Sequence, residues 1–300
     1  MSSNKIVKRI RYALRWVPDR YYIQMNYFGH FHKFANLDNP TTYNEKLNWL
    51  KLYDHNPLYT TIVDKYEAKK YIEKILGKGY SIPTLGVWDK FEDIEFKSLP
   101  ESFVMKCTHD SEGVYIVKEK ASMNVDEARL FIETALGQNF YYIGREWPYK
   151  NVKPRIIVEP YLEDKIDGEL RDYKFFCFDG EPRFMYIAAG RSHDATTFDF
   201  YDLKFNHLDI RQKYPNSPVP LRKPSTFETM ISLSRELSNG FKHIRVDFYE
   251  VNGKLYVGEL TLYPMSGFLP YIPSKWDKEF GELLQLPSSL GGVEWVEEKK

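Results

Sequence analysis

The sequence predicts an α+β protein with a helical N-terminal region, because helical and strand patterns occupy different parts of the chain. Residues 1–60 carry helical patterns, whereas short runs rich in β-branched and aromatic residues dominate after residue 80. The order is helices first and then strands with interspersed helices, which predicts the α+β class. We therefore expect helices first and then a sheet protein with two lobes.

The composition argues against several classes of protein. Hydrophobic residues make up 43% and charged residues 28% of the 300, which is ordinary for a globular chain and argues against disorder. Lys plus Arg and Asp plus Glu each number 42, so the chain lacks the basic excess that general nucleic-acid binding requires. Aromatic residues reach 16%, and we expect most of them in the core of a β-rich protein.

The two cysteines, Cys107 and Cys177, lie in separate apolar runs that look like strands. They predict buried thiols rather than a disulfide framework, and a reducing compartment. No apolar run is long enough to predict a transmembrane helix, and the first residues lack the pattern of a secretory signal. Together these observations predict a cytoplasmic protein.

The N-terminal segment is strongly basic. The first 20 residues contain a single acidic residue, Asp19, and these basic residues: Lys5, Lys8, Arg9, Arg11, Arg15 and Arg20. A helix is predicted from Lys5 to Trp16, ended by Pro18, with an apolar stripe of Ile6, Ile10, Ala13, Leu14 and Val17. We expect residues 5–17 to contact the inner membrane surface, although the same stripe also suits packing on the domain.

Four further helices carry start or stop signals. Thr42 and Glu45 form a capping box before the first of them. A second is predicted over residues 61–76 and is stopped by Gly77 and Gly79. A third is predicted to run from a cap formed by Asn124 and Glu127 to Gly137. The fourth is predicted to run from a cap formed by Ser225 and Glu228 to Asn239-Gly240. Strands are predicted for SIPTLGVW, FVMKC, VYIV, PRIIVEPYL, DYKFFCF and PRFMYIAA, and a hairpin for HIRVDFYE and KLYVGELT, turning at Asn252-Gly253.

The hairpin carries two acids, Asp247 and Glu259, inside otherwise apolar strands. Buried carboxylates need neutralising partners, and two on neighbouring strands suit Mg²⁺, which prefers oxygen ligands. A two-residue turn would set Asp247 opposite Gly258 and send Glu259 to the other face, whereas a bulge would bring both acids to one face. The alternative is two solvated charges on an outer face.

The segment FVMKC-THDSEG-VYIV places Lys106 at a strand end, before a loop that contains Ser111 and Gly113. A lysine and backbone N–H groups in this position suit phosphate oxygens, although a single glycine in a hairpin loop more often marks an ordinary turn. Lys65, near the start of a helix in VDKYEAKKYI, is a further cation whose role the local pattern leaves open.

Polar groups also mark three later strands. Glu159 ends PRIIVEPYL, with Leu162 three residues on, and the freed backbone there can pair with an adenine edge or be a plain strand end. Asp172 and Lys174 share one strand face, and Arg191 ends the next strand. These three suit ribose and phosphates, and equally an exposed cross-strand ion pair. Motifs for zinc, nucleophile-elbow, P-loop and dinucleotide sites are missing.

The order of these features resembles the ATP-grasp superfamily, and within it the TupA-like ATP-grasp family linked to teichuronopeptide and capsular polysaccharide synthesis. The likeness covers roughly residues 40–272. Three stretches carry it: VDFYEVNGKLYVGELTLYPMSGF, NEKLNWLKLYDHNPLY and KCTHDSEG.

The resemblance implies two lobes that grip ATP, and a role for each candidate residue. It implies that Lys65 and Lys106, with the loop of Ser111 and Gly113, contact phosphates, and that Lys174 and Arg191 contact the γ-phosphate or the acyl group. It implies that Glu159 and the backbone of Leu162 contact adenine and that Asp172 contacts the ribose. Mg²⁺ would be bound by Asp247 and Glu259. Thr261 stands where many members have a metal-binding Asn. The implied segments are 1–60 (helical), 61–157 and 158–272 (the lobes) and 273–300 (an extension).

The implied reaction is ATP-dependent ligation of an amine or amino acid to the carboxyl of a hexuronic acid in a surface glycan, through an acyl phosphate. No covalent enzyme residue is needed, because positioning and charge neutralisation carry phosphoryl transfer. A glycosyltransferase using Asp199 and Asp202, a sugar kinase and a non-catalytic capsule-assembly partner remain alternatives. The sequence leaves the oligomeric state, the amine and the glycan open.

Overall fold

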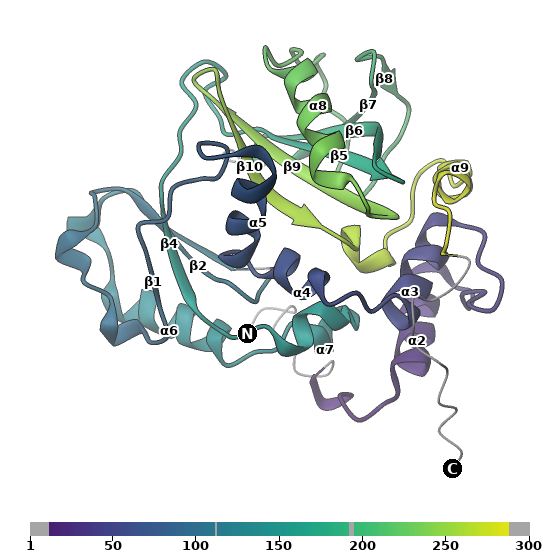
Figure 1. The fold of residues 1–300 in the computed structure, drawn as a ribbon, viewed down its shortest axis with the longest axis horizontal. Coiled ribbons are helices and arrows are strands. Elements are labelled where there is room, and N and C mark those ends of the chain that lie inside the picture. The colour runs from purple at the N-terminus through teal and green to yellow at the C-terminus, as the bar shows by residue number, and fades with distance from the viewer. Residues whose placement is uncertain (1–11, 112, 192–194, 288–300) are drawn as a thin grey trace.

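The computed structural model describes residues 12–111, 113–191 and 195–287, and the fold in that part of the chain is α+β, as expected (Figure 1). Its α-helices are α2 (Asp19–Phe31), α3 (Tyr43–Tyr53), α4 (Leu58–Val63), α5 (Glu67–Leu76), α6 (Val125–Leu136), α7 (Tyr141–Gly144), α8 (Phe227–Ser238) and α9 (Lys275–Leu283).

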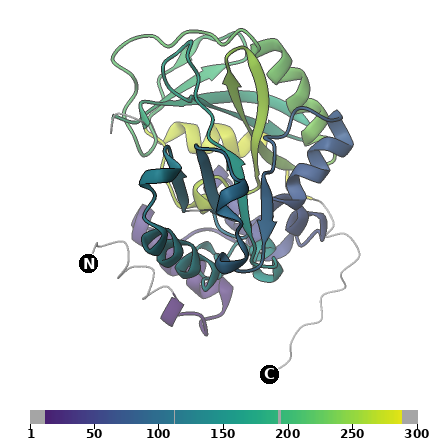
Figure 2. The same cartoon turned by 90° about the vertical axis from the view of Figure 1, so that its left-hand side faces the viewer.

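The strands form two antiparallel sheets. The smaller sheet has the order β1-β4-β2-β3, made by β1 (Gly86–Trp88), β2 (Phe103–Cys107), β3 (Val114–Val117) and β4 (Ile156–Pro160). The larger has the order β10-β9-β5-β6-β7-β8, made by β5 (Asp172–Phe178), β6 (Glu181–Ala189), β7 (Thr197–Asp202), β8 (His207–Leu208), β9 (His243–Val251) and β10 (Lys254–Thr261). Figures 1 and 2 show them as separate sheets, with α6 against the smaller one and α8 against the larger.

The C-terminal helix packs on the N-terminal helical region. The Asp277 carboxylate on α9 accepts hydrogen bonds from the backbone N–H of Asn44 at 3.0 Å and from its side chain at 2.8 Å. Gly281 permits the close contact, because a Cβ there would lie 2.3 Å from the carbonyl oxygen of Thr41. Helices α2, α3 and α9 therefore build one helical layer beside the sheets.

Aromatic side chains fill the core under the larger sheet, which accounts for much of the aromatic excess. Phe184 stacks on Phe176 and on Phe280, with ring centroids 4.5 and 3.9 Å apart. Each such buried ring contributes about 2–3 kcal/mol through burial. A separate apolar cluster, which includes Met105 and Ile132, joins the smaller sheet to α6. Each sheet thus has its own core.

Several local predictions are confirmed. The Thr42–Glu45 capping box begins α3, Asn124 caps α6 before Gly137, and Asn252-Gly253 forms a two-residue turn between β9 and β10. Cys107 and Cys177 are buried free thiols, and burial raises the pKa of both to about 12. No described helix is long and apolar enough to cross a membrane.

Two helix predictions are wrong in detail. The helix predicted over residues 61–76 is broken into α4 and α5, because the Asp64 side chain accepts the N–H groups of Tyr66 and Glu67 and starts a new helix there. Ser225 does not cap α8, since its hydroxyl donates to Glu250 on β9. The helix predicted from Lys5 lies mostly outside the described residues, which begin at Tyr12.

Candidate active site

The β9–β10 hairpin places Asp247 directly opposite Glu259. The turn has two residues, so regular pairing would put Gly258 opposite Asp247, but the register shifts between Val257 and Glu259. Gly258 is the extra residue, and the Tyr249 ring takes the place of its side chain: a Cβ on Gly258 would lie 2.4 Å from that ring. The bulge therefore brings both acids to one face.

Asp247 is fully buried and neutralised by two cations. Arg245 donates to both of its carboxylate oxygens, at 2.7 and 2.8 Å, and Lys174 of β5 donates to one of them. Burial alone would raise the pKa of Asp247, but Arg245 and Lys174 outweigh it and lower the pKa. Asp247 therefore also fixes the side chains of Arg245 and Lys174 in place.

A chain of opposite charges continues across the larger sheet. Lys174 Nζ lies 2.7 Å from Asp172 Oδ2, and Arg191 Nη1 lies 3.3 Å from the same oxygen. Asp172 and Lys174 are buried, whereas Arg191 is half exposed. The structure thus shows a mostly buried network in place of the exposed cross-strand pair that the sequence left open, and the network fixes the positions of Lys174 and Arg191 at the cavity.

On the smaller sheet, Glu159 pairs with two lysines. Lys106 Nζ lies 2.6 Å from one of its oxygens, and Lys69 Nζ of α5 lies 2.5 Å from the other. Burial would raise the pKa of Glu159, but the two lysines lower it. Lys65 donates to the carbonyl oxygen of Asp110, in the loop that follows β2.

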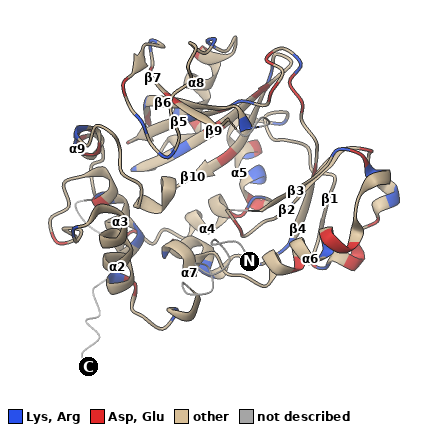
Figure 3. Ribbon diagram, turned by 180° about the vertical axis from the view of Figure 1, so that it is seen from behind, with Lys and Arg blue, Asp and Glu red and all other residues tan. Residues whose placement is uncertain are grey.

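One cavity of about 680 Å³ collects most of the predicted site residues from both sheets. Its lining includes Lys65, Lys106, Ser111, Glu159, Asp172, Lys174, Arg191, Glu259 and Thr261. Asp247 lies behind this lining, bound to Arg245, which does line the cavity. Leu162 and Gly113 are not among the lining residues. Figure 3 marks residues of both charges along α5, β9 and β10, which border the cavity.

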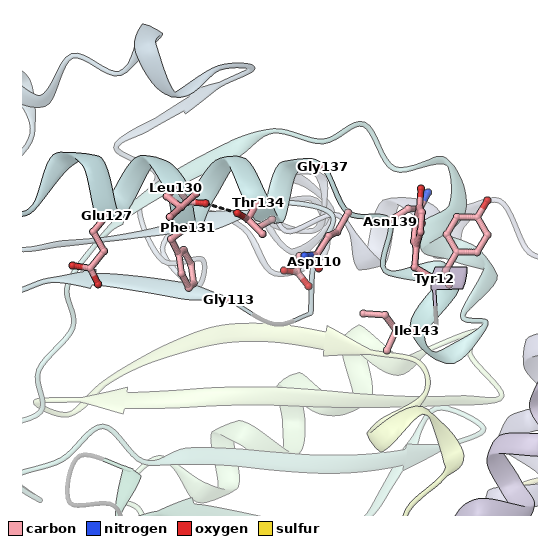
Figure 4. A pocket seen from close by; sticks show the side chains of 13 residues that line it. Tyr12, Asp110, Gly113, Glu127, Leu130, Phe131, Thr134, Gly137, Asn139 and Ile143 are labelled. Carbon is pink, nitrogen blue, oxygen red and sulfur yellow. Dashed lines mark hydrogen bonds between the residues drawn. The ribbon is translucent and has the colours of Figure 1, made fainter. Parts of the chain in front are cut away.

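A second cavity, of about 750 Å³, lies beside α6 and α7 and contains Gly113 (Figure 4). Its lining is largely apolar, with Leu130, Phe131 and Ile143, and a Cβ on Gly113 would touch the Phe131 ring at 3.5 Å. The cavity lacks the lysines and arginines of the first one. We therefore place the chemistry in the cavity between the sheets, although it is the smaller of the two.

The residues present fit a magnesium ion bound together with phosphates. Glu259 lines the cavity beside Asp247, and no ion pair to Glu259 occurs among the described residues. No cluster of three or more His, Cys, Asp or Glu exists in the described part of the chain, so phosphate and water oxygens would have to complete the shell, as is usual for Mg²⁺. Thr261 Oγ1 already accepts from Arg245 at 3.0 Å, which makes it the weakest candidate ligand.

Sequence reasoning missed four charged residues of this cavity: Lys69, Lys213, Arg245 and Glu146. Arg245 stands two residues before Asp247 in one strand, so strand alternation alone would have placed both on one face. Lys69 and Glu146 carry no local signal, because they reach the cavity only through contacts between distant segments.

The acids proposed for a glycosyltransferase have structural partners instead. Asp199 accepts the backbone N–H of Ser217 at both oxygens, and Asp202 accepts those of Lys204 and Asn206 within a turn. Neither lines the cavity between the sheets. These contacts do not favour a glycosyltransferase.

Two antiparallel sheets with a cavity between them, lined by lysines, arginines and carboxylates, define an ATP-grasp protein. The model of the TupA-like ATP-grasp family matches residues 45–285, and the chain belongs to that family. A comparison with curated proteins gives no match.

Solved structures with a similar fold include several ligases. D-Alanine–D-alanine ligase from Bacillus anthracis complexed with ATP is 16% identical, with a TM-score of 0.40, over 67% of this chain and 54% of that one. The corresponding ligase from Helicobacter pylori is 15% identical, with a TM-score of 0.42, over 81% and 69%. Phosphoribosylamine–glycine ligase from Thermotoga maritima is 14% identical, with a TM-score of 0.41, over 72% and 52%. The chain thus spans about half the length of two of these structures.

Proposed function

We propose that the protein is an ATP- and Mg²⁺-dependent carboxylate–amine ligase that forms an amide bond and releases ADP and phosphate. The observation that carries the proposal is the cavity between the sheets, which is lined by cations from both sheets and by Glu259, the residue directly opposite Asp247 in the hairpin. Such a site suits phosphoryl transfer, which requires positioning and charge neutralisation rather than a covalent nucleophile. Membership of an ATP-grasp family supports ATP as the phosphoryl donor.

In the proposed first step, an oxygen of the substrate carboxylate attacks the γ-phosphorus of ATP, and the bond from that phosphorus to ADP breaks. Lys65 and Lys106 face the phosphates, and Lys174, Arg191 and Arg245 neutralise the transferred group. Glu259 would hold magnesium, with Asp247 directly opposite it in the hairpin, and the ion would supply further neutralisation of phosphate charge.

In the proposed second step, the amine attacks the carbonyl carbon of the acyl phosphate, and phosphate leaves with one oxygen of the original carboxylate.

For the nucleotide, we propose that Asp172 contacts the ribose and that the backbone at Leu162 contacts adenine. Glu159 fixes Lys69 and Lys106 beside it. The division into segments 1–60, 61–157, 158–272 and 273–300 also stays a proposal, and its middle boundary falls inside β4.

For the carboxylate substrate, we propose a hexuronic acid of a bacterial surface polysaccharide. Lys213 and Arg191 line the same cavity and suit a carboxylate. Tyr214 lines it beside Lys213 and is partly exposed, so its ring can stack on a sugar; the buried Phe198 packs edge-on against it, with ring centroids 4.9 Å apart. This combination supports a sugar acid more than a small amino acid.

We also propose that the protein works in the cytoplasm at the inner membrane surface, where lipid-linked glycans are available. Besides the basic residues of segment 5–17, exposed apolar side chains support this: Trp16, Tyr21, Met25, Phe28 and Phe34. Tyr21, Met25 and Phe28 share one face of α2. The full-length protein should float with anionic vesicles and less so at high salt; if it stays at the bottom of the gradient with anionic and neutral vesicles alike, the membrane proposal is wrong.

The function is tested by ADP release in the presence of ATP, Mg²⁺, a uronic-acid glycan and pooled amino acids. A ligase releases ADP continuously only when carboxylate and amine are both present. A sugar kinase releases ADP without the amine, and a glycosyltransferase leaves ATP unchanged. ADP release that is independent of the amine would contradict the proposal.

A further inference from the structure

One buried carboxylate that lines the cavity between the sheets belongs neither to the Glu159 cluster nor to the Asp247 network. Glu146 lines the cavity and is 5% exposed. Its Oε1 accepts a hydrogen bond from the Ser266 hydroxyl, and no described residue donates to its Oε2. Glu146 lines the same cavity as Glu259, Arg245 and Lys174, and the charges of Lys51, Glu259 and Arg245 act on its carboxylate.

Distant parts of the chain fix Glu146 in place. The preceding residue, Arg145, has a positive φ of 56°, is fully buried, and donates to the carbonyl oxygens of Leu14 and Val17. Lys51 of α3 donates to the carbonyl oxygens of Gly144, at 2.7 Å, and of Ser266, at 2.9 Å. Lys51 therefore links the segment that carries Glu146 to the segment that carries Ser266, which donates to Glu146.

The backbone around the donor is unusual for non-glycine residues. Met265 and Ser266 have φ values of 51° and 53° within the short helix Pro264–Gly267, a conformation that costs energy for residues with a side chain. Gly144 lacks a Cβ where one would lie 2.6 Å from Ser266 Oγ and 3.2 Å from Glu146 Oε1. Strain and close approach together aim this hydroxyl at the carboxylate.

We propose that Glu146, held by Ser266, binds the incoming amine and takes its proton. This inference rests on the proposed ligase function and adds a site for its second substrate. The negative carboxylate attracts the ammonium group of the amine into the cavity that Glu146 lines. Burial raises the pKa of Glu146, with Lys51 opposing the effect, and a raised pKa suits a group that accepts a proton near neutral pH.

The step balances as follows. The ammonium group gives one proton to Glu146 and becomes a neutral amine. Its nitrogen lone pair forms the C–N bond to the acyl carbon, while the C–O bond to phosphate breaks and phosphate leaves with that electron pair. The second proton lost from nitrogen goes to the departing phosphate, and Glu146 returns its proton to solvent.

Hydroxylamine separates this role from the rest of the reaction, because it is largely uncharged at neutral pH and needs no base to become a nucleophile. We compare Glu146→Gln with the wild-type protein, using D-glucuronate and D-galacturonate as carboxylates. The nucleophile is either a pool of amino acids or hydroxylamine, and amide or hydroxamate is measured. Gln keeps the size of the side chain and an acceptor for Ser266. Glu181→Gln, an exposed residue of β6, is the matched control.

The expected result is that Glu146→Gln lowers amide formation by about 100-fold or more while hydroxamate formation stays within about 3-fold of wild type. Equal loss of both products, or loss of neither, would overturn the inference. If the wild-type protein itself makes no hydroxamate from either uronate, the proposed function fails instead. Should Glu146→Gln not fold, as judged by thermal melting, Ser266→Ala takes its place, with the same selective loss expected.

Discussion

Glu259 lies directly opposite Asp247 across β9 and β10, although the turn that joins these strands has only two residues. The one-residue bulge at Gly258 is what reconciles the short turn with two acids on one face. The two acids nevertheless differ. Asp247 is saturated by Arg245 and Lys174, whereas Glu259 faces the cavity without an ion pair among the described residues.

This difference predicts unlike consequences for two similar substitutions. Glu259→Gln should lower ATP turnover by about 100-fold or more and leave the melting temperature nearly unchanged, because it removes a predicted metal ligand but strands no cation. Asp247→Asn should also lose turnover, and in addition about 3–5 kcal/mol of stability, because it leaves Arg245 and Lys174 facing a neutral side chain. ADP release and chemical denaturation check both; equal stability of the two variants would contradict the assignment.

The bulge itself can be tested at Gly258. An alanine Cβ there would lie 2.4 Å from the Tyr249 ring, so Gly258→Ala should cost about 1–3 kcal/mol and disturb the register that pairs the acids. ATP turnover should fall with it. Gly29→Ala on α2 is the matched control, because nothing lies within 4 Å of the added Cβ and alanine favours the helix. A Gly258→Ala protein with normal turnover would show that the bulge is dispensable.

Lys106 and Lys69 share Glu159, which predicts a mild structural effect when one lysine is lost. Lys106→Met should weaken ATP binding by about 10-fold, while the apo protein keeps most of its stability because Lys69 still neutralises the carboxylate. Titration calorimetry with a non-hydrolysable ATP analogue measures the first effect. Unchanged affinity would remove Lys106 from the nucleotide site.

The Glu159 cluster also predicts a dependence of stability on pH. Because Lys106 and Lys69 lower the pKa of Glu159 below its ordinary value, this carboxylate stabilises the fold fully at neutral pH. That contribution falls as the pH drops below about 4, where the unfolded chain takes up the proton first. Glu159→Gln should therefore be about 3 kcal/mol less stable than wild type at pH 7, with a difference that shrinks towards pH 3. A difference that is constant with pH would contradict the pairing.

Local patterns predicted much of the fold and several residues of the candidate site. The Thr42–Glu45 box, the Asn252-Gly253 turn and the alternating strands each depend on residues close in sequence, so their signals are visible in the chain. The two acids of the hairpin were predictable for the same reason, and the bulge that aligns them was one of the two geometries left open.

The remaining features depend on contacts between distant segments. Lys69 is one of several lysines in its helix, and only the packing of α5 on the smaller sheet distinguishes it. Glu146 needs Lys51 and Ser266, which lie 95 residues before and 120 residues after it. The break at Asp64 was missed because its side chain competes with the helix for backbone N–H groups.

The most direct test of ligation through an acyl phosphate follows oxygen. The protein is incubated with ATP, Mg²⁺, pooled amino acids and a uronic acid whose carboxylate carries ¹⁸O at both oxygens, and the phosphate released is analysed by mass spectrometry. Attack of the carboxylate on the γ-phosphorus predicts that one ¹⁸O appears in each phosphate, and only when an amine is present to complete turnover. Unlabelled phosphate released together with ADP would contradict the acyl phosphate and, with it, the proposed function.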